Sequence, residues 1–464
     1  MDSSPRLSRS RRPASRCADR WGAWSVPGIL AMTLACSSSV QPLPDTRDGT
    51  DELDADDADQ MPPDSPEDVG FAEDHADADG TATDGETADA DRGEILSCDG
   101  PVLDAWGGLS DAGSGCQEVL ADPGPGIRFL LPLLMAGGGG YVALVPGETT
   151  PPGLIWLIRV DCGAYLEVEP VEGCPTGELT IQYPWLGYTC VWQAEEVPDP
   201  PPGTGTWVYA VRLYNIATAE RRQFHYIRFT PLVYGVPAMR SIEISWPWIA
   251  TEDCRNGPGW CGIVLINAET GEERVLSALY DGTDEGPRID GNYVVFDRFT
   301  SGFAWNPWIY DIATGTASSI LMDTIDEWDT QVDGGWVIWV DQRNDPEGTA
   351  FSPRSPDLYG WEIASRTERP LVVAPGGQVE PILKDGWLFW TDYRNDPVDP
   401  SGSWGSTNGD VYARTVPDGP EFHLTAFPDT REWVIDKDGD WVYVYRGNVD
   451  LEVNQGQLLR CPVP

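Results

Sequence analysis

Two stretches of this chain repeat each other: DGGWVIWVDQRNDP at residues 333–346 and DGWLFWTDYRNDP at residues 385–397. Each begins with an Asp-Gly turn signal, continues as an apolar run and ends in Asp-x-Arg-Asn-Asp-Pro. A short apolar run between turn residues predicts a β-strand that is buried on both faces. The repetition predicts a protein built from copies of one small β unit.

Weaker copies of this strand extend the repeat, at a spacing of about 45 to 55 residues, which is the length of a propeller blade. They begin at residues 246, 290 and 438, with two more candidates at residues 140–145 and 184–192. A second apolar strand follows each loop, as at residues 209–217, 263–271, 308–315, 357–363 and 410–412. Thr-Gly endings then indicate a hairpin into a third strand, for example residues 273–276.

Radially packed sheets bury both faces of such strands, and closing them into a ring limits exposed edges. We therefore predict an all-β fold, a β-propeller over residues 96–464, with seven blades and with six as the alternative. The last unit, residues 438–464, is too short for a whole blade. The region from Cys98 to Leu134 contains a strand-like run, Ile127 to Leu131, and we expect this N-terminal part to complete the C-terminal blade.

These repeats resemble the TolB-like, WD40-like β-propeller repeats of bacterial envelope proteins. The shared pattern is a glycine, an apolar strand, Asp-x-Arg, then Asp-[Ile/Leu/Val]-Tyr and a Thr-Gly turn. It fits residues 240–450 well and residues 137–240 poorly. The resemblance implies a propeller fold and an envelope location, but it implies neither a ligand nor a reaction.

The N-terminus has the layout of a secretory signal, with six arginines before an apolar run from Trp21 to Ala35. That run is shorter than the ~20 residues of a membrane-spanning helix. Cys36 follows a small residue, which resembles the lipobox of bacterial lipoproteins, whose cysteine is diacylated. We predict a signal peptide over residues 1–35 and a lipidated Cys36. Ordinary secretory cleavage is the alternative, because Thr33 and Leu34 depart from the lipobox pattern.

Residues 36–95 are predicted to form a disordered acidic linker. From Gln41 to Ile95 there are 20 acidic side chains, two arginines and one aromatic residue. Such a segment buries too little apolar area to offset its chain entropy, and its like charges extend it. The whole chain has a formal net charge of −45. A protein this acidic repels phosphate backbones, so we expect no nucleic-acid partner.

Eight cysteines follow Cys36, and an even number in an exported chain predicts disulfides. Pairing close neighbours predicts the bonds Cys98–Cys116, Cys162–Cys174 and Cys254–Cys261, which leaves Cys190 for Cys461. None of them has the CxxC spacing of a zinc or redox site.

Two sets of residues are candidates for ligand binding. The repeated Asp341/Arg343 and Asp392/Arg394 would bind an anion if their arginines met on the propeller axis. The alternative, which the repetition favours, is that each arginine pairs with a carboxylate of its own or the next blade.

The second set lies on the loops at residues 347–356, 398–409 and 195–205, which are long. Phe351 and Trp404, on the first two, offer contact area for peptides or sugars. Elaborate surface loops without a ligand are the alternative.

The sequence offers few candidate catalytic residues or motifs. Outside the linker only His225 and His423 occur, and neither Gly-x-Ser-x-Gly nor a phosphate-binding glycine loop is present. Residues 436–440 resemble part of a calcium loop but lack its distal glutamate, so a β-turn is expected there. We assign no catalytic residue, metal or cofactor; a carboxylate pair of the kind that glycosidases use cannot be picked out from sequence.

The sequence therefore predicts a monomeric lipoprotein, in the periplasm or at the cell surface, that acts as a scaffold for an envelope or extracellular protein. The alternative is a carbohydrate-binding or polysaccharide-cleaving propeller that uses exposed tryptophans and a carboxylate pair. A purely structural role in the envelope is the third possibility.

Overall fold

The structure is a computed structural model of the whole chain, which divides into two units, residues 1–91 and 92–464. The residues that it describes all belong to the second unit. They are residues 96–121, 135–145, 154–168, 176–193, 207–229, 241–254, 261–277, 283–300, 304–322, 324–345, 355–401, 407–428, 430–447 and 456–464. The predicted signal peptide, Cys36 and the acidic linker lie outside them.

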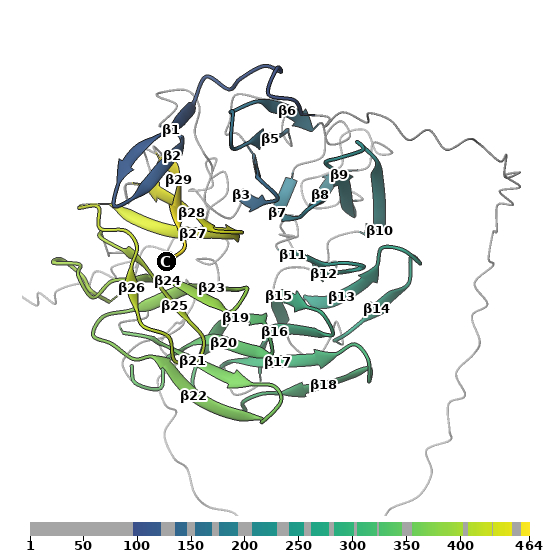
Figure 1. Cartoon of the computed structure of the whole chain (residues 1–464). Helices are drawn as coiled ribbons and strands as arrows, with labels where there is room; N and C mark the ends of the chain where they lie inside the picture. Colours follow the sequence, from purple (N-terminus) through teal and green to yellow (C-terminus); the bar gives the residue numbers. More distant parts are fainter. Residues whose placement is uncertain are drawn as a thin grey trace, which may run out of the picture. The chain divides into compact units, whose positions relative to one another are not determined.

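Seven antiparallel sheets make up the described part of the chain, which contains no helix and hence none that could cross a membrane (Figure 1). The first two blades, in chain order, lie where the repeat fits poorly, and blade 3 lies where it fits well. Blade 1 consists of β3 (Met135–Gly138), β4 (Tyr141–Leu144), β5 (Ile155–Arg159) and β6 (Tyr165–Val168). Blade 2 consists of β7 (Thr176–Gln182), β8 (Trp185–Gln193), β9 (Trp207–Asn215) and β10 (Arg221–Phe229). Blade 3 consists of β11 (Ile242–Ser245), β12 (Trp248–Asp253), β13 (Gly262–Asn267) and β14 (Glu273–Val275).

The next three blades follow the repeat closely. Blade 4 consists of β15 (Thr283–Asp290), β16 (Tyr293–Phe299), β17 (Trp305–Asp311) and β18 (Thr316–Ser319). Blade 5 consists of β19 (Glu327–Asp333), β20 (Trp336–Asp341), β21 (Asp357–Glu362) and β22 (Thr367–Val372). Blade 6 consists of β23 (Gln378–Lys384), β24 (Trp387–Asp392), β25 (Asp410–Thr415) and β26 (Phe422–His423).

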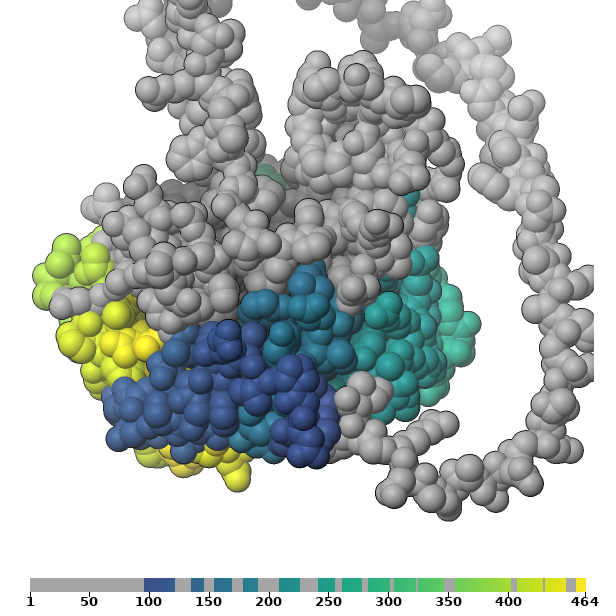
Figure 2. Space-filling model, turned by 90° about the horizontal axis from the view of Figure 1, so that it is seen from above, coloured from purple at the N-terminus to yellow at the C-terminus, as the bar shows by residue number. Residues whose placement is uncertain are grey.

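Blade 7 closes the ring with strands from both ends of the propeller. Its order is β27 (Arg431–Asp438), β28 (Trp441–Gly447), β29 (Gly456–Pro462), β2 (Cys116–Leu120) and β1 (Trp106–Gly113). β2 pairs antiparallel with β29, and Figure 2 shows the blue N-terminal strands against the yellow C-terminal ones. The seven-blade prediction is therefore confirmed. The strand-like run at residues 127–131 lies outside the described residues, and β1 and β2 complete the blade instead.

The predicted strand order within a blade was wrong by one position. The apolar strands predicted to come first, such as β20 and β24, are the second strands from the axis. The innermost strands, among them β19 and β23, were missed because they alternate polar and apolar residues, as in EWDTQVD. Each innermost strand contacts the innermost strands of both neighbours, and β27 contacts β3, so the ring is continuous.

The core lies between neighbouring blades. Ile338 and Leu358 of blade 5 pack with Leu383 and Trp390 of blade 6, and all four are at least nine-tenths buried. Each aliphatic side chain of this kind contributes about 1.5–3 kcal/mol on burial. The apolar second strand of each blade therefore supplies most of the packing, as its sequence predicts.

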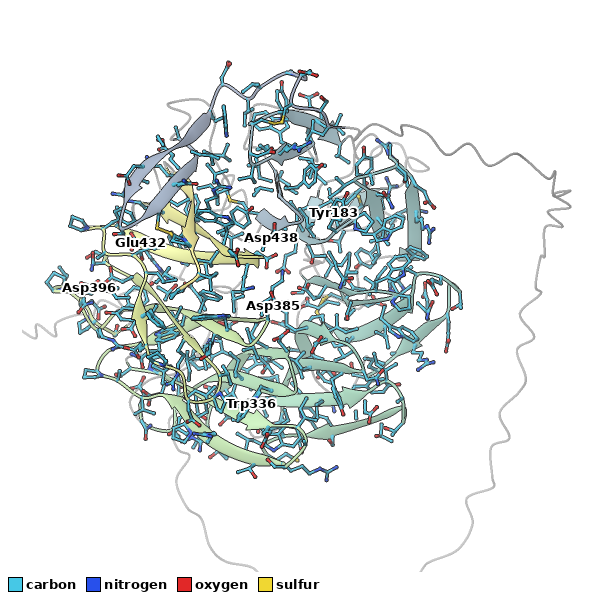
Figure 3. All side chains as sticks on the ribbon, in the orientation of Figure 1. Tyr183, Trp336, Asp385, Asp396, Glu432 and Asp438 are labelled. Atoms are coloured by element: carbon cyan, nitrogen blue, oxygen red, sulfur yellow. A yellow bond between two sulfur atoms is a disulfide. The ribbon has the colours of Figure 1, made fainter. Side chains whose placement is uncertain are left out.

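The turns between first and second strands bind the next blade. A backbone N–H of the turn donates to the carboxylate that ends the preceding innermost strand. The pairs are Gly334 to Asp290 at 2.9 Å, Gly386 to Asp333 at 2.9 Å and Gly140 to Asp438 at 2.6 Å. Figure 3 shows Asp438 and the turn residue Asp385 beside the middle of the ring. The Asp-Gly signal of the repeat thus joins blades as well as reversing the chain, and residues 439–440 form such a turn rather than a calcium loop.

Two of the described disulfides connect residues that are far apart in sequence. The bonds are Cys98–Cys162, Cys116–Cys461 and Cys254–Cys261, and Cys190 is also disulfide-bonded. Only the predicted pair Cys254–Cys261 is found; Cys174 lies outside the described residues. Pairing by proximity in sequence failed because ring closure brings Cys116 on β2 beside Cys461 on β29, and because the bridge from Val102 to Ala164 brings Cys98 to Cys162.

Candidate functional site

The repeated Asp-x-Arg-Asn motif forms a clasp inside its own blade. In blade 5, the Arg343 Nε and Nη2 donate to Asp341 at 2.9 and 2.6 Å, and Nη1 reaches Glu368 at 2.5 Å. The buried Trp339 also donates its Nε1–H to Asp341, at 2.9 Å. Asn344 completes the clasp by donating to Asp357 on the neighbouring strand, at 2.7 Å.

Blade 6 repeats the clasp residue by residue. Arg394 donates to Asp392 and to Glu421, at 2.6 and 2.7 Å, while Trp390 donates to Asp392 at 2.9 Å. The guanidinium lies 4.5 Å from the centre of the Tyr412 ring. Because the donors of these arginines are used within the blade, the geometry follows the structural alternative and leaves no anion-binding ring of arginines.

The two long loops that follow the clasps contain Phe351 and Trp404, which lie outside the described residues. The ends of both loops are held by the second aspartate of the motif. Asp345 accepts from the Ser355 N–H at 3.0 Å. Asp396 accepts from four backbone N–H groups, those of Val398, Asp399, Thr407 and Asn408. Burial alone would raise the pKa of Asp396, but these four donors hold it below its usual value.

The two histidines outside the linker both lie against carboxylates. His225, on β10, lies between Glu273, 2.8 Å from Nδ1, and Asp253, 3.4 Å from Nε2. Burial lowers the pKa of His225, but the two carboxylates outweigh it and the net shift is upward. His423 pairs with Asp410 at 3.0 Å.

The innermost strands supply a second set of charged side chains, which interact across the ring. Glu243 on β11 interacts electrostatically with Lys384 on β23 and Asp436 on β27. Blade 3 is adjacent to neither blade 6 nor blade 7, so these side chains face the axis. We call this set the axial cluster; its members are Glu178, Glu243, Arg288, Asp329, Glu380, Lys384 and Asp436.

Carboxylates outnumber bases in the axial cluster. Lys384 pairs with Asp436 at 2.6 Å, and Thr180 donates to Glu243 at 3.0 Å. Arg288 interacts with several of the carboxylates, yet no described carboxylate oxygen forms an ion pair with it. The cluster therefore keeps an excess of negative charge on the axis.

The pKa values of these carboxyls are displaced upward. Burial, together with the nearby Glu380 carboxylate, raises the pKa of Asp329 to about 6, and Arg288 opposes the shift. Burial likewise raises the pKa of Glu243 and of Asp436, although Lys384 acts in the opposite direction on both. The charged forms are thus less stable than in water, and a cation brought near them would stabilise them.

Asp329 and Glu380 occupy equivalent positions in blades 5 and 6. Each lies at a β-bulge, where the register of the innermost strand shifts, and each has φ of 55°. Blade 4 has Gly286, with φ of 63°, at the corresponding shift. A non-glycine residue in this region costs roughly 1–2 kcal/mol, and a bulge commonly re-aims a side chain. Blades 5 and 6 therefore have a strained backbone conformation at the position from which a carboxylate faces the axis.

Groups of blade 7 fix the Glu380 carboxylate, and Asp329 lies beside a second buried carboxyl. Glu380 accepts from Arg431 and from the Trp433 indole of blade 7, both at 2.9 Å. Asp329 precedes Thr330, whose hydroxyl donates to the buried Asp297 of blade 4. Burial raises the pKa of Asp297 to about 8, and Asp329 adds to the rise. The pKa of Asp297 is thus raised further than that of its neighbour Asp329.

Metal-ligating side chains gather at two places among the described residues, Cys98/Asp161/Cys162 and Glu252/Cys254/Cys261. The four cysteines are disulfide-bonded, so neither group offers a thiolate. These groups do not form a zinc site.

Sequence reasoning missed the axial cluster because it missed the innermost strands. The signal that marks them is position: each ends at or immediately before an Asp-Gly, Gly-Gly, Tyr-Pro or Trp-Pro turn. Counting seven or eight residues back from the turn would have located TDEGPRID, EWDTQVD and QVEPILK. Their charged residues at bulge positions would then have been candidates for the axis.

No protein-family model matches the chain, and no curated protein matches it. Solved structures of propellers match it in fold. The propeller domain of the trilobed protease from Pyrococcus furiosus is 11% identical with a TM-score of 0.49, over 72% of this chain and 95% of that one. TolB from Acinetobacter baumannii is 14% identical with a TM-score of 0.34, over 68% and 78%. A prolyl endopeptidase is 8% identical with a TM-score of 0.48, over 73% of this chain, which spans only 50% of that enzyme. These likenesses concern the fold alone.

Proposed function

We propose that this protein is an exported, lipid-anchored scaffold whose axial channel binds a cationic segment of a protein partner. The carrying observation is the axial cluster, in which carboxylates from five blades face two bases. Cys36 would carry the lipid, and residues 36–95 would hold the propeller away from the membrane. Disulfides such as Cys116–Cys461 support export, because such bonds persist in oxidising compartments.

We expect a guest to reach the axial cluster from the end of the ring at which the second strands β20 and β24 stop. Glu327, at the start of β19, pairs with Asp341, at the end of β20, and Gln378 pairs with Asp392 in the same way. The loops at residues 347–356 and 398–409 therefore leave their blades beside the bulges that bear the axial carboxylates. A partner whose charged segment enters the channel would also meet these loops.

A cationic guest fits the electrostatics better than an anionic or neutral one. The pKa of Asp329 is raised, so its charged form gains from any positive group brought near it. A chain with a net charge of −45 also attracts basic segments at long range and raises their association rate. Binding should therefore weaken as salt screens the field.

The test compares two variants that remove the same charge. Asp329→Asn with Glu380→Gln removes both bulge carboxylates, whereas Asp104→Asn with Glu167→Gln removes two exposed carboxylates from the outer surface. Fluorescence anisotropy would measure the binding of short extended peptides with several lysines to the full chain. We expect about a tenfold loss of affinity in the axial variant and almost none in the outer one.

Equal weakening in both variants would reduce the effect to general charge attraction and would count against an axial site. Affinity capture from an envelope extract, with the same pair of variants, then identifies the natural partner. The partner should be retained by the outer variant and lost with the axial one.

A further inference from the structure

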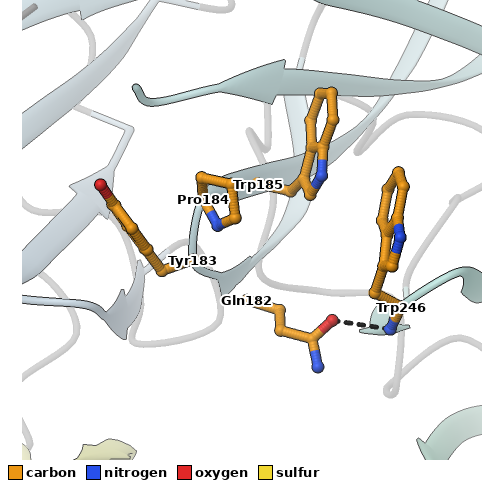
Figure 4. Close-up of a pocket in the computed structure, with 5 residues that line it drawn as sticks. All are labelled: Gln182, Tyr183, Pro184, Trp185 and Trp246. Carbon is orange, nitrogen blue, oxygen red and sulfur yellow. Dashed lines mark hydrogen bonds between the residues drawn. The ribbon is translucent and has the colours of Figure 1, made fainter. Parts of the chain in front are cut away.

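The turn face of blades 2 and 3, opposite the loop face, has an aromatic hollow of about 350 Å³ (Figure 4). Its lining residues are Gln182, Tyr183, Pro184, Trp185 and Trp246. This volume is near the lower end of small-molecule pockets, which measure ~300–1,000 Å³. Tyr183 is 48% exposed and Trp246 is 36% exposed, although large aromatic side chains are usually covered.

The sequence builds the hollow by replacing the Asp-Gly turn of the repeat. Blades 2 and 3 have Tyr183-Pro184-Trp185 and Trp246-Pro247-Trp248 at the turn, where blades 5 and 6 have glycine. The last residue of the innermost strand keeps its role of joining blades: the Gln182 Oε1 accepts from the Trp246 N–H at 2.7 Å. The frame is thus preserved, while exposed aromatic rings have been added at its surface.

Both exposed rings are held in place before any ligand arrives. Trp246 stacks on Trp185, with ring centres 5.2 Å apart and planes 5° from parallel, and Tyr183 stacks on Tyr141 at 6.0 Å and 4°. The Trp246 Nε1–H also donates to Glu269 at 3.2 Å. Rigid rings lose little conformational entropy on binding, which favours recognition of a small ligand.

Two polar groups complete the hollow. The amide nitrogen of Gln182 and the hydroxyl of Tyr183 have no hydrogen-bond partner among the described residues, although the oxygen of the same amide is used. A flat apolar surface beside a few free donors and acceptors suits a molecule with both an apolar face and hydroxyl groups.

We propose that this hollow binds a neutral pyranose ring of a glycan. The ring would stack its C–H face on Trp246 or Tyr183, and its hydroxyls would accept from the Gln182 amide. The site is independent of the scaffold function proposed above, since it lies on the opposite face.

The charges around the hollow select this ligand over others. None of the five lining residues is ionisable near neutral pH, and the net charge of −45 opposes anionic sugars. Arg222 lies 4.9 Å from the Trp185 ring centre but is paired with Glu220 at 2.7 Å, so it offers no uncompensated charge to an ionic ligand. An extended proline-rich peptide needs a series of aromatic grooves along its length, whereas the hollow is a single short one.

The test uses the full chain and defined probes: maltotetraose, cellotetraose, chitotetraose and mannotetraose as neutral glycans, a galacturonate oligomer as the acidic control and a proline-rich peptide. Tryptophan fluorescence and ligand-observed NMR would measure binding. The variants are Trp246→Ala, Tyr183→Ala and Gln182→Ala. Trp441→Ala, which removes the tryptophan that follows the turn of blade 7, is the matched control.

We expect at least one neutral glycan to bind, about tenfold more weakly to Trp246→Ala and a few-fold more weakly to Gln182→Ala, with Trp441→Ala unchanged. Gln182→Ala keeps every aromatic residue but loses the acceptor of the Trp246 N–H; near-ultraviolet circular dichroism that matches the parent protein then lets it test the site even if Trp246→Ala unfolds the blade. The proposal is overturned if no neutral glycan binds at about 10 mM, if binding persists in all three hollow variants, or if only the acidic oligomer or the peptide binds.

Discussion

Blades 5 and 6 fix the end of the second strand with one clasp, whereas blades 2 and 3 fix the same position in two other ways. The position is the fifth residue after the tryptophan that follows the turn. It is Asp341 in blade 5 and Asp392 in blade 6, each bound to an arginine two residues on. In blade 3 it is Asp253, which pairs with His225 of blade 2, and in blade 2 it is the disulfide-bonded Cys190.

The fold requires that this position of the second strand be fixed, and the repeat uses only one of several interactions that can fix it. In blades 3, 5 and 6 the second strand ends at this position, whereas in blade 2 β8 continues to Gln193; a frayed end would expose the buried second strand. An ion pair inside the blade, an ion pair between blades and a covalent bond all meet the requirement. Blades 2 and 3 also depart from the repeat at their turns, and this departure creates the aromatic hollow. The blades that differ from the repeat thus carry a feature that the repeat lacks.

Breaking the clasp of blade 6 should have the largest effect. Asp392→Ala leaves Arg394 without its buried partner and the Trp390 Nε1 without an acceptor. We expect the free energy of unfolding to fall by about 3–5 kcal/mol, as when one partner of a buried pair is removed. Urea unfolding followed by tryptophan fluorescence measures it.

The control for this variant is Asp418→Ala, which removes an exposed partner of Arg369 and should cost less than about 1 kcal/mol. A similar small loss in Asp392→Ala would mean that the clasp adds no more than a surface ion pair.

The sequence was sufficient for the frame of the propeller because the frame is built from local patterns. Turn glycines, apolar second strands and Thr-Gly hairpins recur with one period, and they predict seven blades and a ring completed from the N-terminal side. The same logic predicted that Arg343 and Arg394 are structural, since a residue repeated in each clasp serves the blade.

The contacts that could not be predicted are those between residues distant in sequence. Cys116 and Cys461 are separated by 345 residues, and only ring closure brings them together. Glu243 and Asp436 interact electrostatically across the axis, although their blades are not adjacent. The hollow needs two turns, one ending blade 2's first strand and one ending blade 3's, and neither turn alone forms a site.

Removing the disulfide of Cys190 in blade 2 should lower the free energy of unfolding less than removing Asp392 in blade 6. Cys190→Ser deletes a disulfide, for which about 2–4 kcal/mol is typical. The loss should be seen in urea unfolding under oxidising conditions and should disappear in excess reductant, where the parent protein has no bond to lose. The cost of Asp392→Ala should persist in reductant, and a Cys190→Ser effect of equal size in both conditions would assign that residue a packing role instead.

The His225–Asp253 ion pair between blades 2 and 3 should contribute least to the free energy of unfolding, compared with the Asp392 clasp and the Cys190 disulfide. Its contribution should also be the only one of the three that depends on pH near neutrality. The ion pairs with Glu273 and Asp253 raise the folded-state pKa of His225 above its ordinary value of 6.5. A raised folded pKa gives stability that is complete below the unfolded value and is lost as pH rises through the folded one. His225→Gln should therefore lower the free energy of unfolding by about 1 kcal/mol at about pH 6 and by progressively less toward about pH 9.

The control is Asp392→Ala, whose cost in unfolding free energy should stay level over the same range, since Arg394 does not titrate there. If the cost of His225→Gln instead grew with pH, the neutral imidazole would be the stabilising form, and the tie between blades 2 and 3 would be a hydrogen bond rather than an ion pair.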